Sequence, residues 1–187
     1  MAPKAKLLLV ALLLACFALA LPASASAARC DNDDMLPVAG NFDKVRSTTL
    51  CLLNAERTSR GLGRLRSDRQ LAKAARRFSA HMVRERFFGH VSPAGSTLSS
   101  RVRGGTSYLR GPVRTWSLGE NLAWGAGELA TPRNIVRGWM ESRGHRANIL
   151  DGRFRHVGIG VVTGAPADTR GQAAATYTTD FGFRARR

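Results

Sequence analysis

The order of the predicted secondary-structure elements constrains the fold of this chain more than any other feature. Two segments with the apolar periodicity of helices, 42–60 and 68–86, come first. Three segments with strand-like alternation follow: 115–124, 156–162 and 173–183. One further helical segment, 131–144, is inserted between the first and second strands. Helices before strands, with one helix inserted, predict a single α+β domain in which helices cover a sheet.

The first 28 residues have the pattern of a secretory signal peptide. Lys4 and Lys6 give a positive start, residues 7–21 form an apolar run, and residues 23–28 are small, as a cleavage region requires. No second apolar run of this kind follows, so no transmembrane segment is predicted after signal removal. A lipid-anchored alternative rests on Cys16, but this cysteine lies inside the apolar run, which favours ordinary cleavage. We therefore expect a secreted protein. A short lead-in segment, residues 29–44, follows the signal peptide.

Removal of the signal segment leaves two of the three cysteines, Cys30 and Cys51. An even number of cysteines in an oxidising compartment favours a disulfide. A bridge closing a loop of this length stabilises a fold by about 3 kcal/mol. The alternative is a buried Cys51 with an unpaired Cys30 near the mature N-terminus.

The formal net charge of the chain is +16, and loss of Lys4 and Lys6 lowers it to +14. A charge of this size favours loose association with anionic cell-wall or membrane surfaces. Arginine supplies 25 of the 29 cations and is scattered through every segment. No basic block is interleaved with aromatic residues as in single-strand nucleic-acid binders, which argues against nucleic acid as a partner.

The only plausible chemical cluster of the sequence consists of His90, Glu120 and His145. Thr131 caps the inserted helix, and Gly144 is expected to end it in a left-handed conformation, so that His145 begins a new segment. His90 lies on a turn that leaves the preceding helix, and Glu120 lies in the first strand-like segment. The two histidines can therefore project from separate turns into a common space.

Six motifs occur in the order and at the spacing seen in one bacterial family. They are LNAERTSRGLGRLRSDRQLAKAA (53–75), FFGHVSP (87–93), GENLAWG (119–125), WMESRGHRANIL (139–150), HVGIGV (156–161) and YTTDFG (177–182). On these motifs the chain resembles bacterial secreted CAP-domain proteins, also called SCP-like. That superfamily groups cysteine-rich secretory, antigen 5 and pathogenesis-related proteins, and the resemblance covers about residues 45 to 183.

The resemblance implies an α-β-α sandwich over residues 45–187, a secreted location and a cleft lined by two histidines and two glutamates. His90 matches the first histidine of the family, Glu120 the first glutamate, and His145 the second histidine. At the position of the second glutamate this chain has Ser142, which we expect to line the cleft. Glu141 precedes it by one residue, about 100° away around a helix, and is expected to point elsewhere.

Two imidazoles and a carboxylate, with one position left to water, are the ligand set of an exchangeable zinc site. His90, His145 and Glu120 therefore predict a site for Zn²⁺ or a similar divalent ion. The alternative is structural: Glu120 clamps strand to helix in a buried polar network. A bound metal would lower the pKa of its water and permit hydrolysis at neutral pH, although no HExxH-type spacing is present.

Two classes of function remain open at this point. The first is an extracellular binding module for a lipid, glycan or peptide, in which a metal serves a regulatory role. The second is a metal-dependent extracellular hydrolase. The resemblance favours the binding module because CAP proteins generally lack an agreed enzymatic activity. Ser142 points the same way, since it removes a candidate general base.

Overall fold

The structure, a computed structural model, describes residues 30–186 of the chain. The predicted signal segment, residues 1–28, lies outside the described residues. Among the helices that are described, none combines the length and the apolar character that a bilayer crossing needs.

The two N-terminal helices confirm their predictions from sequence. Helix α1 runs over Phe42–Thr58 and helix α2 over Arg69–Arg84. The carboxylate of Asp68 caps α2 by accepting from the backbone N–H groups of Gln70 at 2.8 Å and Leu71 at 3.1 Å. A shorter helix, α3 (Leu98–Gly105), begins with a reciprocal capping pair between Thr97 and Ser100.

The inserted helical segment is divided in two, which the sequence did not predict. Helix α4 spans Pro132–Glu141 and helix α5 spans Arg143–Ile149, with a 3₁₀ turn, η1 (Gly127–Ala130), before them. The expectation that Gly144 ends the helix was wrong, because Ser142 adopts an extended conformation and ends α4 two residues earlier. The carbonyl of Ser142 then accepts from the N–H of Arg146 at 2.9 Å and starts α5. His145 is therefore the third residue of a helix rather than the first residue of a loop.

Four strands form one sheet in the order β1-β3-β4-β2. They are β1 (Arg66–Ser67), β2 (Val113–Ala126), β3 (His156–Thr163) and β4 (Ala174–Arg186). β1 runs parallel to β3, whereas the β3–β4 and β4–β2 pairs are antiparallel. β2 is continuous through Gly119. A Cβ at this position would lie 2.8 Å from Cζ of Phe154, so the glycine makes room for that ring.

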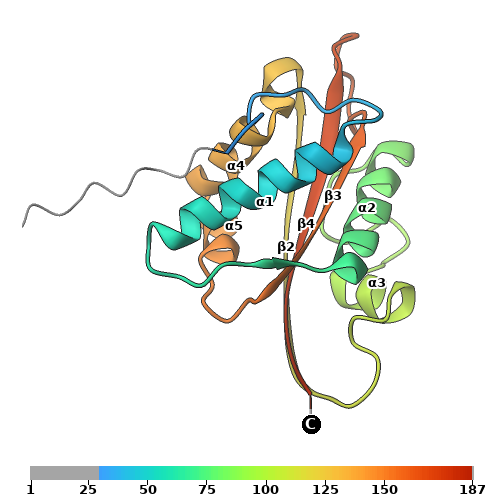
Figure 1. Ribbon diagram of the computed structural model, residues 1–187. Helices are drawn as coiled ribbons and strands as arrows, with labels where there is room; N and C mark the ends of the chain where they lie inside the picture. The colour runs from blue at the N-terminus through green and yellow to red at the C-terminus, as the bar shows by residue number, and fades with distance from the viewer. Residues whose placement is uncertain (1–29, 187) are drawn as a thin grey trace, which may run out of the picture.

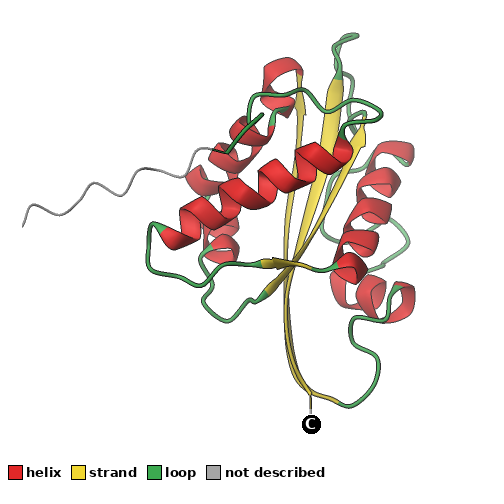
Figure 2. Ribbon diagram, in the orientation of Figure 1, coloured by secondary structure: helices red, strands yellow, loops and turns green. Residues whose placement is uncertain are grey.

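Helices cover both faces of the sheet and complete the predicted α-β-α sandwich. Figure 1 shows α1, α4 and α5 on one side of the strands and α2 with α3 on the other. Figure 2 shows the same three layers coloured by element type. The main core lies under α1 and α4, where Trp139 packs edge-on against Tyr177 and Leu53 is fully buried. On the other face α2 lies in direct backbone contact with β3, because Gly158 and Gly160 present no side chain there.

The predicted disulfide is confirmed: Cys30 is bonded to Cys51. The bridge ties the start of the described chain to the middle of α1. The hydroxyl of Thr48 donates to the carbonyl of Asp31 at 2.8 Å, and Asp33 pairs with Arg133 at the start of α4. The lead-in segment is thereby fastened to two helices of the same layer.

A fully buried arginine fixes the segment that follows α5. The guanidinium of Arg57 donates to four main-chain carbonyls, those of Gly63 (2.8 Å), Ile149 (2.7 Å), Asp151 (3.0 Å) and Phe154 (3.3 Å). No side-chain carboxylate is among these contacts, and Asp151 pairs with Arg153 instead. Burial lowers the pKa of Arg57, and the nearby charge of Arg155 acts in the same direction. The arginine therefore holds α1 to the end of α5, the helix that carries His145.

Candidate functional site

His90 lies on a bend after α2 and is oriented by a buried carboxylate. Its side chain is 58% exposed, and its Nδ1 atom lies 2.9 Å from Oε1 of Glu120 on β2. The Glu120 side chain is only 3% exposed. A ring nitrogen held by a carboxylate leaves the other nitrogen, Nε2, available to a ligand or proton.

The second oxygen of Glu120 is also engaged. Nη2 of Arg101, on α3, donates to Oε2 at 2.5 Å, and its Nη1 donates to the carbonyls of His90 and Ser96 at 3.1 and 2.9 Å. The guanidinium also stacks over the ring of Phe78 at 3.4 Å from the ring centre. Arg101 therefore fixes both Glu120 and the bend that carries His90.

A second buried carboxyl group lies beside Glu120. Asp180 of β4 is directly opposite Glu120 in the strand register and has no exposed surface. Neither of its carboxyl oxygens has a hydrogen-bond partner in the described part of the chain. Burial, followed by the charge of Glu120, raises the pKa of Asp180 well above its ordinary value. These surroundings favour a proton on Asp180.

His145 is half-buried on α5 and is held near His90 by amide contacts. Its carbonyl accepts from Nδ2 of Asn121 at 3.0 Å. Asn148, one turn further along α5, donates to the carbonyl of Glu120 at 3.1 Å and to Oδ1 of Asn121 at 2.9 Å. Burial lowers the pKa of His145, and the charge of His90 lowers it further, so the imidazole is neutral at physiological pH.

An apolar cavity of about 400 Å³ lies beside His145 at the β2 edge of the sheet. It is lined by Phe88, Leu122, Ala123, Trp124, Leu129, Asn134, Ile135, Gly138, Trp139, Ser142 and His145. Ser142 thus lies at the cavity, whereas the Glu141 side chain is 73% exposed and lies 3.9 Å from Arg137.

Comparisons with known proteins identify the family of this domain. The model of the Cysteine-rich secretory protein family, CAP, matches residues 50–179. The chain belongs to this family. YkwD of Bacillus subtilis is 41% identical over 112 residues, which are 59% of this chain and 40% of YkwD. The chain thus spans less than half the length of that relative.

Two solved structures share the fold of this CAP domain. An extracellular protein containing an SCP domain from Bacillus anthracis is 28% identical, with a TM-score of 0.57, over 79% of this chain and 44% of that one. An outer surface protein from Borrelia burgdorferi has a TM-score of 0.62 over 81% of this chain and all of that one. At 17% identity, the second likeness concerns the fold alone.

The contacts of Glu120 bear on the predicted metal site of this CAP domain. Both carboxylate oxygens are engaged by His90 and Arg101, so Glu120 fits the role of an orienting carboxylate better than that of a third ligand. Within residues 30–186 no three histidine, cysteine, aspartate or glutamate side chains are grouped closely enough to hold an ion. A zinc site with Glu120 as its third ligand therefore does not fit these contacts, and the two imidazoles remain as donors.

Sequence reasoning missed three residues that build the site: Arg101, Asn148 and Asp180. Asp180 had a visible signal, since it is the only charged residue of a strand that otherwise carries small, aromatic and hydroxyl side chains up to Phe183. Arg101 and Asn148 gave no signal, because each reaches Glu120 across 19 residues or more.

Proposed function

We propose that this CAP domain is an extracellular binding module whose cavity beside His145 takes the apolar part of a ligand. The observation that carries the proposal is a set of large apolar side chains left exposed at that cavity. Phe88 is 50% exposed, Trp124 37% and Leu129 64%. Apolar side chains gathered around a hollow, with few polar groups, are typical of ligand sites.

The cavity lining favours some ligand classes over others. The polar side chains among its lining residues are Asn134, Ser142 and His145, and the indole N–H of Trp139 already donates to the carbonyl of Leu122. A glycan would leave many of its hydroxyl groups without partners there, and each such group costs free energy. An acyl chain or an apolar peptide side chain suits the lining better.

The extracellular location rests on the sequence and on the disulfide. The signal segment at residues 1–28 directs secretion, and the Cys30–Cys51 bridge suits an oxidising compartment. The structural neighbour from Bacillus anthracis is itself described as an extracellular protein. The positive charge of this chain adds loose attraction to anionic surfaces.

The histidine pair gives the cavity a polar rim. His145 lines the cavity, and His90 lies close enough for its charge to act on His145. A divalent ion on the two imidazoles would serve a regulatory role next to the bound ligand. A metal-dependent hydrolase is the second candidate, supported by the orientation of His90 by Glu120, which suits a general base.

Titration with a dansyl-labelled fatty acid tests the binding function. Trp124→Ala and Leu129→Ser each remove exposed apolar surface from the cavity, and we expect each to weaken binding about tenfold. Val38→Ser is the matched control, because Val38 is 48% exposed but does not line the cavity. Equal affinity of all three variants and the native chain would rule out the cavity as the binding site.

Chelation separates the two candidate functions. For a binding module, a chelator leaves fatty-acid binding in place. For the hydrolase, extracellular ester or peptide substrates are cleaved, and the chelator abolishes the cleavage. Hydrolysis that is lost on chelation would favour the second candidate.

A further inference from the structure

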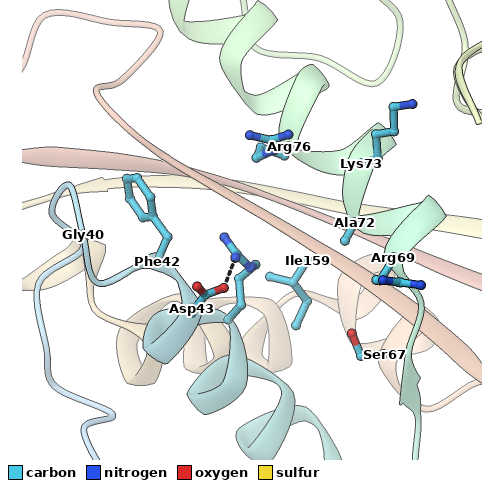
Figure 3. Close-up of a pocket in the computed structure, with 10 residues that line it drawn as sticks. Gly40, Phe42, Asp43, Ser67, Arg69, Ala72, Lys73, Arg76 and Ile159 are labelled. Atoms are coloured by element: carbon cyan, nitrogen blue, oxygen red, sulfur yellow. Dashed lines mark hydrogen bonds and ion pairs between the residues drawn. The ribbon is translucent and has the colours of Figure 1, made fainter.

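A second and larger hollow lies at the opposite edge of the sheet from the cavity beside His145. Its volume is about 710 Å³. It lies beside the β1 edge, between the start of α1 and one stripe of α2, and is also lined by residues of β1 and β3 (Figure 3). The lining residues are Gly40, Phe42, Asp43, Arg46, Ser67, Arg69, Ala72, Lys73, Arg76 and Ile159.

Three of the four cations that line this hollow have no counter-ion within the described part of the protein. Arg69, Lys73 and Arg76 are exposed, and none of them has an ion pair or a side-chain hydrogen bond among residues 30–186. The single carboxylate of the hollow, Asp43, pairs with Arg46 and is 95% exposed. Some arginines elsewhere find carboxylates, as Arg60 does with Glu56, and others, such as Arg110 and Arg143, do not within the described range. What distinguishes Arg69, Lys73 and Arg76 is that they line one hollow together.

The backbone that carries these cations is rigidly held. Arg69, Lys73 and Arg76 are spaced i, i+4 and i+7 and therefore share one face of α2 over about 10 Å. α2 packs directly on β3, since a Cβ on Gly160 would lie 2.2 Å from the backbone nitrogen of Arg76. The cations thus form a row fixed to the edge of the sheet.

The hollow also has an apolar part, made by Phe42, Ala72 and Ile159. Figure 3 shows Phe42 on α1, Ala72 on α2, and Ile159 between the two helices. A row of unpaired cations attracts a row of anions, and the adjacent apolar wall gives room to the carbon skeleton that links them. The concave shape suits a single flexible chain better than a flat bilayer.

We infer that this row, Arg69, Lys73 and Arg76, is a binding site for a phosphodiester-linked polyol or sugar polymer. It is distinct from the cavity beside His145 and does not depend on the function proposed for that cavity. The site localises the loose electrostatic attraction of the chain to one surface. A domain so anchored keeps its other edge free for its ligand.

Binding of a synthetic poly(glycerol phosphate) of defined length tests this inference. The triple variant Arg69→Gln/Lys73→Gln/Arg76→Gln removes the row and should fold normally, because all three side chains are exposed and unpaired. We expect calorimetry at low salt to show affinity lower by about tenfold or more. The slope of log affinity against log salt should also fall by about two, since fewer counterions are released.

The matched control has the same loss of charge at exposed, unpaired arginines elsewhere: Arg110→Gln/Arg114→Gln/Arg143→Gln. It should weaken binding less than about threefold through long-range charge alone. In the native chain, backbone amide NMR shifts on adding polymer should concentrate in residues 67–76 and at Ile159.

Three results would overturn the assignment. Equal weakening in both triple variants would show that diffuse charge, and not the row, binds the polymer. Failure of the native chain to bind the polymer would show that the row is not a site for it. Tighter binding of a single-stranded oligonucleotide of matched charge, or of phosphatidylglycerol vesicles, would show that the row serves a different class of partner.

Discussion

Replacement of Arg57 tests how far one buried cation holds the site together. Arg57→Met keeps most of the side-chain volume but removes every donor. Four carbonyls then lose the guanidinium as a donor, and two of these contacts, to Ile149 and Phe154, are buried. The carbonyl of Phe154 keeps a second donor, Nη1 of Arg155 at 3.1 Å. The other two, to Gly63 and Asp151, are partly exposed, so water can replace the guanidinium there.

The expected loss follows from these contacts. The buried carbonyl of Ile149 is left without a donor, which costs about 1 to 3 kcal/mol, and loss of the other three hydrogen bonds adds about 1 to 2 kcal/mol. Burial of the methionine and relief from holding a charge away from water offset part of this, because uncharged replacements in buried sites recover desolvation energy. We expect a net loss of about 3 kcal/mol for Arg57→Met, and about half of it for Arg57→Lys, which keeps the charge but not the planar fork.

Urea unfolding at neutral pH, with the disulfide intact, measures this loss. Arg60→Met is the control, since Arg60 lies one turn later in sequence and forms an exposed pair with Glu56; it should cost less than about 1 kcal/mol. Because Arg57 also fixes the end of α5, Arg57→Met should weaken fatty-acid binding beside His145. Similar unfolding midpoints for Arg57→Met and Arg60→Met would refute this account of the buried arginine.

Three further predictions concern the carboxyl pair, the α2 contact and the histidines. Because the pKa of Asp180 is raised in the folded chain, the stability that its protonated side chain contributes is fully present below pH 3.8, the ordinary pKa, and is lost as pH rises. Asp180→Asn should therefore raise the urea midpoint at pH 7, and this gain should shrink towards pH 4. Gly160→Ala should destabilise the fold by about 3 kcal/mol or more in thermal unfolding, because the new Cβ meets the backbone of α2. The control, Gly138→Ala, has open space around the new Cβ and should be neutral or stabilising. Calorimetric titration with Zn²⁺ should show moderate binding that fails below about pH 6 and is lost in both His90→Ala and His145→Ala; unchanged binding in the two variants would leave the pair a structural polar network.

Local sequence signals located most elements because their causes are local. Asp68 accepts from N–H groups two and three residues away, so the start of α2 is visible in a short window. The alternation of residues 173–183 likewise predicts β4 without knowledge of its partners. The break between α4 and α5 was not visible in this way. Gly144 was the stronger local signal, yet the chain turns at Ser142, where α5 must swing back to reach Asn121 on β2.

The candidate site likewise has residues that are visible in local sequence and partners that are not. His90, Glu120 and His145 were recognisable as a set from the motifs around them, but their partners were not. From the sequence, Glu120 could bind a metal or accept from an imidazole or a guanidinium. The fold brings Arg101 within 2.5 Å of it, a contact that the sequence does not indicate.

The sequence alone was enough to locate α1, α2 and the three long strands, and it favoured the Cys30–Cys51 bridge and the pairing of the two histidines. The folded chain was needed to see that Asp180 lies opposite Glu120, that Arg57 is buried without a carboxylate, and that the cations of α2 line a hollow. The physical reason is that burial and charge pairing depend on which segments meet in space. Strand register sets Asp180 opposite Glu120 across 60 residues, and no local pattern encodes that distance.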